Sequence, residues 1–195
     1  GIICGTPLTM SCTYAPLAEM TDCDRMSASD LDEAVDAGKF VFMWDGEKVK
    51  VCRAVNSFVT TTGTKGESFK KIKVVDTMDM INDDIRLTAQ DSYIGKYAIS
   101  YDNRCLLLTA VNSYFAGLIQ DGVLASGKCE IDVDAQRSYF SGKGGIVVVD
   151  GEEKKLEECT DDEIKQANTG SRVFLKAVIS ILDAIEDIDL DIYIG

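Results

Sequence analysis

The sequence predicts an α+β fold in which two long amphipathic helices flank a mixed β-sheet. Residues 72–93 and residues 102–120 each repeat apolar side chains at the helical period of about 3.6 residues, so each has one apolar face. Residues 40–51 instead alternate with the two-residue period of strands on both sides of a turn. A chain of 195 residues, 46% of them hydrophobic, is long enough to bury a sizeable core beneath such elements.

The composition excludes several classes of function. The formal charge is -13, from 33 acidic and 20 basic residues, and this charge repels phosphate backbones and anionic lipids. No apolar run approaches the roughly 18 to 20 residues that a membrane span requires. The chain contains no histidine, so it cannot form a Ser-His-Asp or Cys-His catalytic site. We therefore expect no nucleic-acid binding, no membrane association and no histidine-based catalysis.

The cysteines are dispersed along the chain and form no C-x-x-C pair. A structural metal site would need clustered thiolates or imidazoles. We expect reduced cysteines that pack as small apolar side chains, with no metal and no cofactor bound. The seven cysteines are Cys4, Cys12, Cys23, Cys52, Cys105, Cys129 and Cys159.

Residues 1–28 predict an irregular segment that forms the end of a preceding domain. The two prolines of the chain, Pro7 and Pro16, lie in this segment and favour turns. Because the chain opens at Gly1 without an initiator methionine, we expect it to be part of a longer protein. We assign residues 29–186 to a core domain and residues 187–195 to a C-terminal strand or arm.

A short helix and a hairpin are expected at the start of the core domain. Ser29 favours the N-cap of a helix that ends near residue 37. In residues 40–51, the pair Asp45-Gly46 favours a two-residue type I′ turn between the strands. Residues 56–66 then predict an exposed loop. Its glycines lack the Walker spacing, so we expect an ordinary surface loop without a phosphate site.

The helix predicted at residues 72–93 has a polar, solvent-exposed face opposite its apolar face. Asp76, Asp79 and Asp83 follow one another on that face at spacings of three and four, and Gly95 favours the end of the helix. We interpret the aspartates as a solvated face that can serve as a partner-contact surface. A magnesium site is disfavoured, because the adjacent acids Asp83 and Asp84 diverge by about 100° and no phosphate loop accompanies them.

Short motifs follow one another in a fixed order between residues 56 and 97. In this order they resemble the C-terminal domain of contractile tail sheath proteins, which build the sheaths of myophages and R-type bacteriocins. The resemblance is greatest to the defective-phage type of Gram-positive bacteria; it extends over residues 2–194 and is strongest over residues 56–118. The motifs are Asn56-Ser57 with its threonine run, Lys65-Gly66, Phe69-Lys70-Lys71-Ile72, Asp79-Met80-Ile81, Asp83-Asp84-Ile85 and Tyr93-Ile94-Gly95-Lys96.

The resemblance implies a mechanical, non-enzymatic function. Sheath subunits stack around an inner tube in a metastable state, and contraction to a lower-energy lattice drives the tube through a cell envelope without nucleotide. The implied partners are other copies of the sheath protein, the inner tube protein, and the baseplate and tail terminator proteins. The implied location is a virion tail or bacteriocin particle, assembled in the bacterial cytoplasm.

Further strands and a short helix are expected in the second half of the chain. Residues 129–134 alternate as a half-buried strand. Residues 146–156 predict a second hairpin, turned by Asp150-Gly151. Thr160 begins a capping box that opens a short helix. Residues 173–181 are largely apolar on both faces, which favours a central strand.

The last segment alternates strictly between apolar residues and Asp187, Asp189, Asp191 and Tyr193. Such a strand is typical of a sheet edge or of a strand donated to another molecule. We expect it either to fold back beside residues 173–181 or to pair with a neighbour's sheet, as chain termini do in the resembling family. The candidate subunit-linking residues are Ile188, Leu190, Ile192 and Ile194.

The sequence leaves two other functions open, a carboxylate-dependent hydrolase and an acidic binding module, and it disfavours a calcium site. The aspartates of the last segment match the first three positions of an EF-hand, but Ile192 stands where a glycine is required. A carboxylate-dependent hydrolase stays possible in principle, because spacing in sequence does not fix the separation of two carboxylates in space. An acidic binding module is the other alternative.

Overall fold

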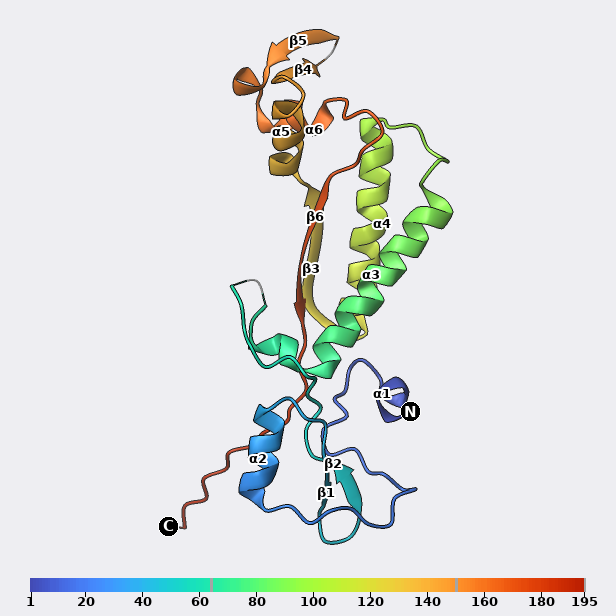
Figure 1. The fold of residues 1–195 in the computed structure, drawn as a ribbon. Coiled ribbons are helices and arrows are strands. Elements are labelled where there is room, and N and C mark those ends of the chain that lie inside the picture. Colours follow the sequence, from blue (N-terminus) through green and yellow to red (C-terminus); the bar gives the residue numbers. More distant parts are fainter. Residues whose placement is uncertain (64, 150, 195) are drawn as a thin grey trace. The chain divides into compact units, whose positions relative to one another are not determined.

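The computed structural model describes residues 1–63, 65–149 and 151–194 (Figure 1). The α+β class is confirmed, but the strands of the described residues lie in three separate two-stranded sheets, whereas we predicted one mixed sheet. The chain divides into two compact units, each described here by itself. Unit 1 comprises Gly1–Asn82 and Ile181–Gly195, and unit 2 comprises Asp83–Ser180.

Unit 1 contains the helices α1 (Ile2–Gly5) and α2 (Ala28–Asp36). The helix predicted near residue 29 is confirmed, but its N-cap is Ser27 and not Ser29. The Ser27 hydroxyl accepts a hydrogen bond from the Asp30 N–H at 3.2 Å, and the Asp30 carboxylate accepts one from the Ser27 N–H at 3.3 Å. This reciprocal pair satisfies two helix-end donors and so fixes where the helix begins.

The first hairpin pairs β1 (Phe42–Trp44) with β2 (Val49–Val51) in antiparallel register, with Trp44 opposite Val49. The prediction that Asp45-Gly46 forms a type I′ turn is wrong. The Asp45 N–H donates to the Lys48 carbonyl at 3.1 Å, so the central residues are Gly46 and Glu47. Of these, Gly46 has a φ of 107°, and a glycine at the first central position is what a type II′ turn requires.

Helix α3 (Ile72–Ser92) begins after the short 3₁₀ helix η1 (Glu67–Lys70) and confirms the predicted long helix. Its first residue is joined to the segment after β2, because the Ile72 N–H donates to the Ala54 carbonyl at 3.0 Å. Gly95 follows the helix with a φ of 76°, which agrees with the predicted end. The buried residues of α3 are Lys73, Val74, Thr77 and Ile81.

In unit 2, helix α4 (Tyr101–Gln120) confirms the second long helix and runs beside strand β3 (Leu124–Ile131) (Figure 1). Phe115 of α4 is 1% exposed and packs against Gly127 of β3. A Cβ atom at Gly127 would lie 3.0 Å from the Phe115 Cβ, so a larger residue there would require Phe115 to move by a few tenths of an ångström.

The strand predicted at residues 129–134 ends at Ile131. The remainder of that prediction is wrong, because Asp132 caps helix α5 (Val133–Ser141) by accepting a hydrogen bond from the Ala135 N–H at 2.9 Å. Strand β6 (Leu175–Ile181) pairs with β3, and Figure 1 shows the two running in opposite directions. Within the described residues β6 has no second neighbour, so it is not the central strand that we predicted.

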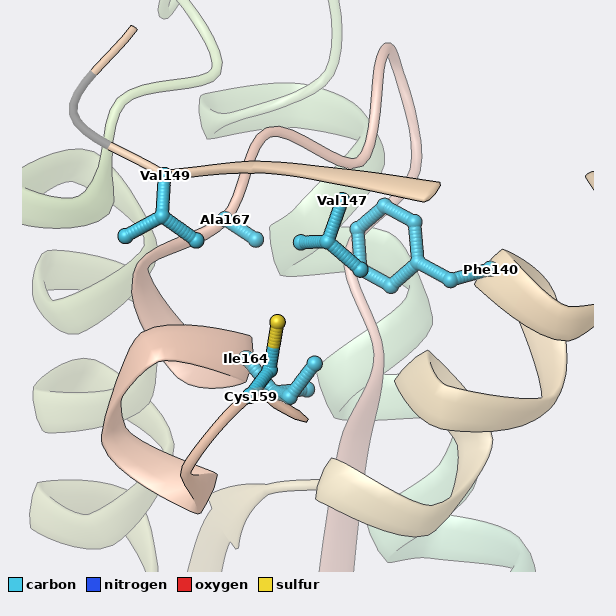
Figure 2. Packing of buried hydrophobic residues seen from close by; sticks show 6 residues of the cluster. All are labelled: Phe140, Val147, Val149, Cys159, Ile164 and Ala167. Carbon is cyan, nitrogen blue, oxygen red and sulfur yellow. The ribbon is translucent and has the colours of Figure 1, made fainter. Parts of the chain in front are cut away.

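The second hairpin, β4 (Ile146–Val149) with β5 (Glu152–Lys155), confirms the predicted strand pair, although Asp150 of its turn lies outside the described residues. The 3₁₀ helix η2 (Leu156–Glu158) leads to α6 (Asp161–Gln166), which has the predicted capping box between Thr160 and Glu163. Together with α5 these elements enclose an apolar cluster, shown in Figure 2, in which Val147 and Ile164 are fully buried. The cluster consists of Phe140, Val147, Val149, Cys159, Ile164 and Ala167.

Candidate functional site

The C-terminal segment, residues 187–194, lies in no helix or strand and is exposed along its whole length. Its four apolar residues, Ile188, Leu190, Ile192 and Ile194, are between 75% and 97% exposed. The segment therefore does not fold back beside β6, which was one of the two arrangements that we expected. Burying these side chains against a partner would contribute about 1.5 to 3 kcal/mol each. Their assignment as a subunit-linking strand stays a prediction.

The chain just before this segment is fixed by Glu186, whose side chain is 7% exposed. One carboxylate oxygen accepts hydrogen bonds from the Ser11 hydroxyl at 2.7 Å and the Thr13 hydroxyl at 2.6 Å. The other lies 3.0 Å from the Lys71 Nζ atom and 3.3 Å from an Arg53 nitrogen. Four donors on two oxygens leave this carboxylate fully satisfied in a partly dry site.

The electrostatics of Glu186 favour a permanent charge. Burial raises the pKa of the carboxyl, but the hydrogen bonds from Thr13, Ser11 and Lys71 outweigh burial, and the pKa lies below its ordinary value. A general acid would need a raised pKa, and a general base would need a free lone pair facing a substrate. Glu186 is therefore built to hold the chain in place and not to transfer protons.

Three cations of unit 1 hold the residues on either side of Glu186. Asp187 pairs with Arg53, and Asp183 pairs with Lys71. The buried Lys73 ammonium group donates to the carbonyl of Leu182. We call residues 182–187 the arm root and residues 188–194 the arm. The root is tied to three separate parts of unit 1, whereas the arm is exposed from its first residue.

The ion pairs of the root raise the pKa values of two of its cations, Arg53 and Lys71. The hydrogen bond from Arg53 to Asp187 raises the pKa of the guanidinium group. Burial lowers the pKa of Lys71, but its contacts with Asp183 and Glu186 outweigh burial and raise it. Arg53 and Lys71 therefore keep their charges over the neutral pH range.

The predicted partner-contact surface lies on helix α3. Asp76 is half-buried, and burial together with the charge of Asp79 raises its pKa. Asp79 is exposed, and Asp83 pairs with Arg86 at 2.8 Å. Within the described part of the chain, no group of three or more acidic or cysteine side chains could hold a metal ion. The use of Asp76, Asp79 and Asp83 as a contact surface stays a prediction.

The two strands of the β3·β6 sheet differ in how their outer edges are covered. On β3, the Cys129 N–H donates to the Asn112 side-chain oxygen at 2.8 Å, and the Asn112 amide donates to the Cys129 carbonyl at 3.0 Å. Helix α4 thus occupies the outer edge of β3 with a side chain that imitates a neighbouring strand. In the described structure no element pairs with the outer edge of β6, and an open edge of this kind can accept an added strand.

No described helix has the length and apolar character needed to cross a lipid bilayer.

Sequence reasoning missed the arm root, because Ser11, Thr13, Arg53 and Lys71 are scattered over the first 71 residues. The one available signal was Glu186 itself, an acid that interrupts the apolar positions at the end of the chain.

Comparison with known proteins connects these features to one family. The family model described as phage tail sheath C-terminal domain matches residues 64–195. A curated tail sheath protein of Clostridium phage phiCD119 is 38% identical over 190 residues, which is 97% of this chain and 51% of that protein. The chain thus spans about half the length of this relative.

Three solved structures share the fold at low sequence identity. The sheath tail protein of Desulfitobacterium hafniense gives a TM-score of 0.58 at 20% identity and is matched by 92% of this chain over 39% of its own length. The contracted helical sheath of the anti-feeding prophage gives a TM-score of 0.59 at 17% identity, and the match covers 95% of this chain and 45% of that chain. The baseplate structure of the anti-feeding prophage gives a TM-score of 0.65 at 15% identity, and the match covers 96% of this chain and 45% of that chain.

Proposed function

Because the chain belongs to the phage tail sheath C-terminal domain family, we propose that it is part of a contractile tail sheath subunit that neighbouring copies join by strand exchange. The subunit surrounds an inner tube and, on contraction, drives the tube through a cell envelope. It works as a structural protein without catalysis. Its partners are other sheath copies, the tube protein, the baseplate and the tail terminator, in a virion tail or bacteriocin particle that is assembled in the bacterial cytoplasm.

The observation that carries this proposal is the contrast between the arm and its root. Four branched apolar residues are exposed at two-residue spacing, which is the spacing of one face of a strand. A free monomer gains nothing from that pattern, whereas a strand that pairs with another molecule buries it. The saturated carboxylate of Glu186 fixes the point from which the arm extends.

The open edge of β6 is the acceptor that fits the arm. Backbone hydrogen bonds would join the arm to β6 whatever the side chains are, and the alternating apolar residues would fix the register. The outer edge of β3 is not available, since Asn112 already occupies the backbone groups of Cys129. Each copy then donates its arm as a strand and accepts another copy's arm at the edge of β6, so the links continue from subunit to subunit.

The test is sheath assembly by the full-length protein that carries a charge on the arm. We expect Leu190→Asp to abolish assembly, because the charge would lie in the buried face of the added strand. The matched control is Tyr193→Asp, which places the same charge on the opposite face of the arm, and it should assemble. Truncation after Glu186 should leave a folded, soluble protein without sheaths. Negative-stain microscopy measures the outcome; normal sheaths from the Leu190→Asp protein would overturn the proposal.

A further inference from the structure

Two cations of unit 2 share one aromatic ring and have no carboxylate partner. The Lys143 Nζ atom lies 5.0 Å from the centre of the Tyr139 ring, and the Arg172 guanidinium carbon lies 5.9 Å from it. Both cations are exposed. Neither forms an ion pair with a described residue, and they are brought together by the same ring. On a chain of charge -13, two neighbouring cations without an acidic partner form a candidate site for an acidic group.

The surrounding structure holds the Tyr139 ring in place. The Tyr139 ring packs against the rings of Phe140 and Phe174, each with a centroid separation of 5.4 Å. The turn before Arg172 depends on Gly170, whose φ is 70° and where an added Cβ atom would lie 3.5 Å from the Tyr139 hydroxyl. The result is a hollow of about 580 Å³ between the end of α5 and this turn. We call it the cationic hollow.

A second hollow of about 600 Å³ lies next to the first, and Gly170 and Ser171 line both. Its other walls are mainly apolar and include Ile94, which is 68% exposed, and Val173, which is 38% exposed. We call it the apolar hollow. An extended segment that lies along the rim formed by Gly170 and Ser171 would have the cationic hollow on one side and the apolar hollow on the other.

We infer that these two hollows are the receptor for the acidic arm of a second copy of the chain. Successive residues of an extended segment point to opposite sides, so the arm would direct Asp189 and Asp191 to the cationic hollow and Ile192 to the apolar one. Because the arm is exposed in its own chain, it is available to pair with another copy. Val173 leads directly into β6, so the receptor begins where the open edge begins. The inference rests on the proposed strand exchange and states what gives the exchange its specificity.

The test uses a fluorescein-labelled peptide of residues 187–195 and the chain of residues 1–195, followed by fluorescence anisotropy. We expect the double substitution Lys143→Glu and Arg172→Glu to weaken binding by at least about tenfold, because like charges then face each other. The control is Lys39→Glu with Lys48→Glu, two exposed lysines of unit 1, which makes the same change in net charge. This control should retain the affinity.

A charge exchange separates recognition from any loss of folding. A peptide with Asp189→Lys and Asp191→Lys should bind the charge-reversed protein more tightly than it binds the original chain. Equal binding of the unchanged peptide to the original and the reversed protein would overturn the receptor, as would the absence of measurable binding to the original chain.

Sheath assembly then distinguishes the two proposals. If assembly of the full-length protein survives the reversal of Lys143 and Arg172 but fails with Leu190→Asp, strand exchange stands and the receptor is wrong. If assembly survives Leu190→Asp as well, the proposed function itself fails.

Discussion

Replacing Glu186 with glutamine should weaken unit 1 at the arm root. The substitution keeps the side-chain size but removes the negative charge that faces Arg53 and Lys71, and one amide oxygen cannot replace two carboxylate oxygens. Hydrogen bonds to charged groups contribute about 1.5 to 3 kcal/mol each. The Arg53 and Lys71 side chains are 28% and 32% exposed, so water compensates for part of the loss. We expect the free energy of unfolding to fall by about 2 to 3 kcal/mol.

Thermal unfolding followed by far-ultraviolet circular dichroism measures this change. For a chain of this size, the expected loss corresponds to a decrease in Tm of about 5 to 10 °C. The matched control is Asp189→Asn, an acid-to-amide change in the exposed arm, which should leave Tm within about 1 °C. A decrease of less than about 2 °C for Glu186→Gln would refute the reasoning, because it would show that water replaces the carboxylate at little cost.

The dependence on pH follows from the lowered pKa of Glu186. A carboxyl whose pKa is lower in the folded than in the unfolded chain stabilises the fold above its unfolded value, which is ordinarily 4.5. That contribution declines as the pH falls below 4.5 and through the lowered folded pKa. The Tm difference between the original chain and Glu186→Gln should therefore be constant from pH 7 to about pH 5 and shrink below it. A difference that grows on acidification would contradict the assignment.

Three further predictions concern the core, a helix cap and metals. Ile164→Ala should lower the free energy of unfolding, measured by chemical denaturation, by about 2 to 5 kcal/mol, since Ile164 is fully buried in the apolar cluster. Ile146→Ala should lower it much less, because Ile146 is 53% exposed. Thr160→Ala should cost about 1 kcal/mol by removing half of the capping box of α6, and Thr160→Ser should restore it. Treatment with EDTA should leave Tm unchanged within about 1 °C, and a larger decrease would reveal a structural metal.

The parts of the fold that local chemistry determines could be predicted from the sequence. The long helices were predictable because their apolar period and the glycine after α3 lie within the helix or next to it. The capping box of Thr160 and Glu163 likewise lies within four residues. Helix α5 was missed because Asp132, Val133 and Asp134 continue the alternation of β3, and only the hydrogen bond from the Ala135 N–H to Asp132 reveals the cap.

Contacts between distant residues could not be predicted in the same way. The sheet ends at β3 on one side because Asn112 of α4 closes the outer edge of β3. On the other side, no described strand lies beyond β6, and the apolar pattern of residues 173–181 does not reveal this. The arm root joins Glu186 to Ser11 across 175 positions of sequence. The strict alternation of the arm was visible, but an alternating pattern does not say which surface covers it.

The arm root also determines how the chain would transmit a mechanical load. Tension applied to the arm would first reach Asp187 and Glu186, where ion pairs and hydrogen bonds to Arg53, Lys71, Ser11 and Thr13 would all be loaded together. Bonds loaded in parallel share the force, whereas a strand peeled from its edge breaks one pair at a time. Since the root precedes the arm along the chain, it would shield the hydrogen bonds of β6 from the pull. If the arm pairs with a second copy as proposed, the root would therefore carry the pull before the β3·β6 sheet does.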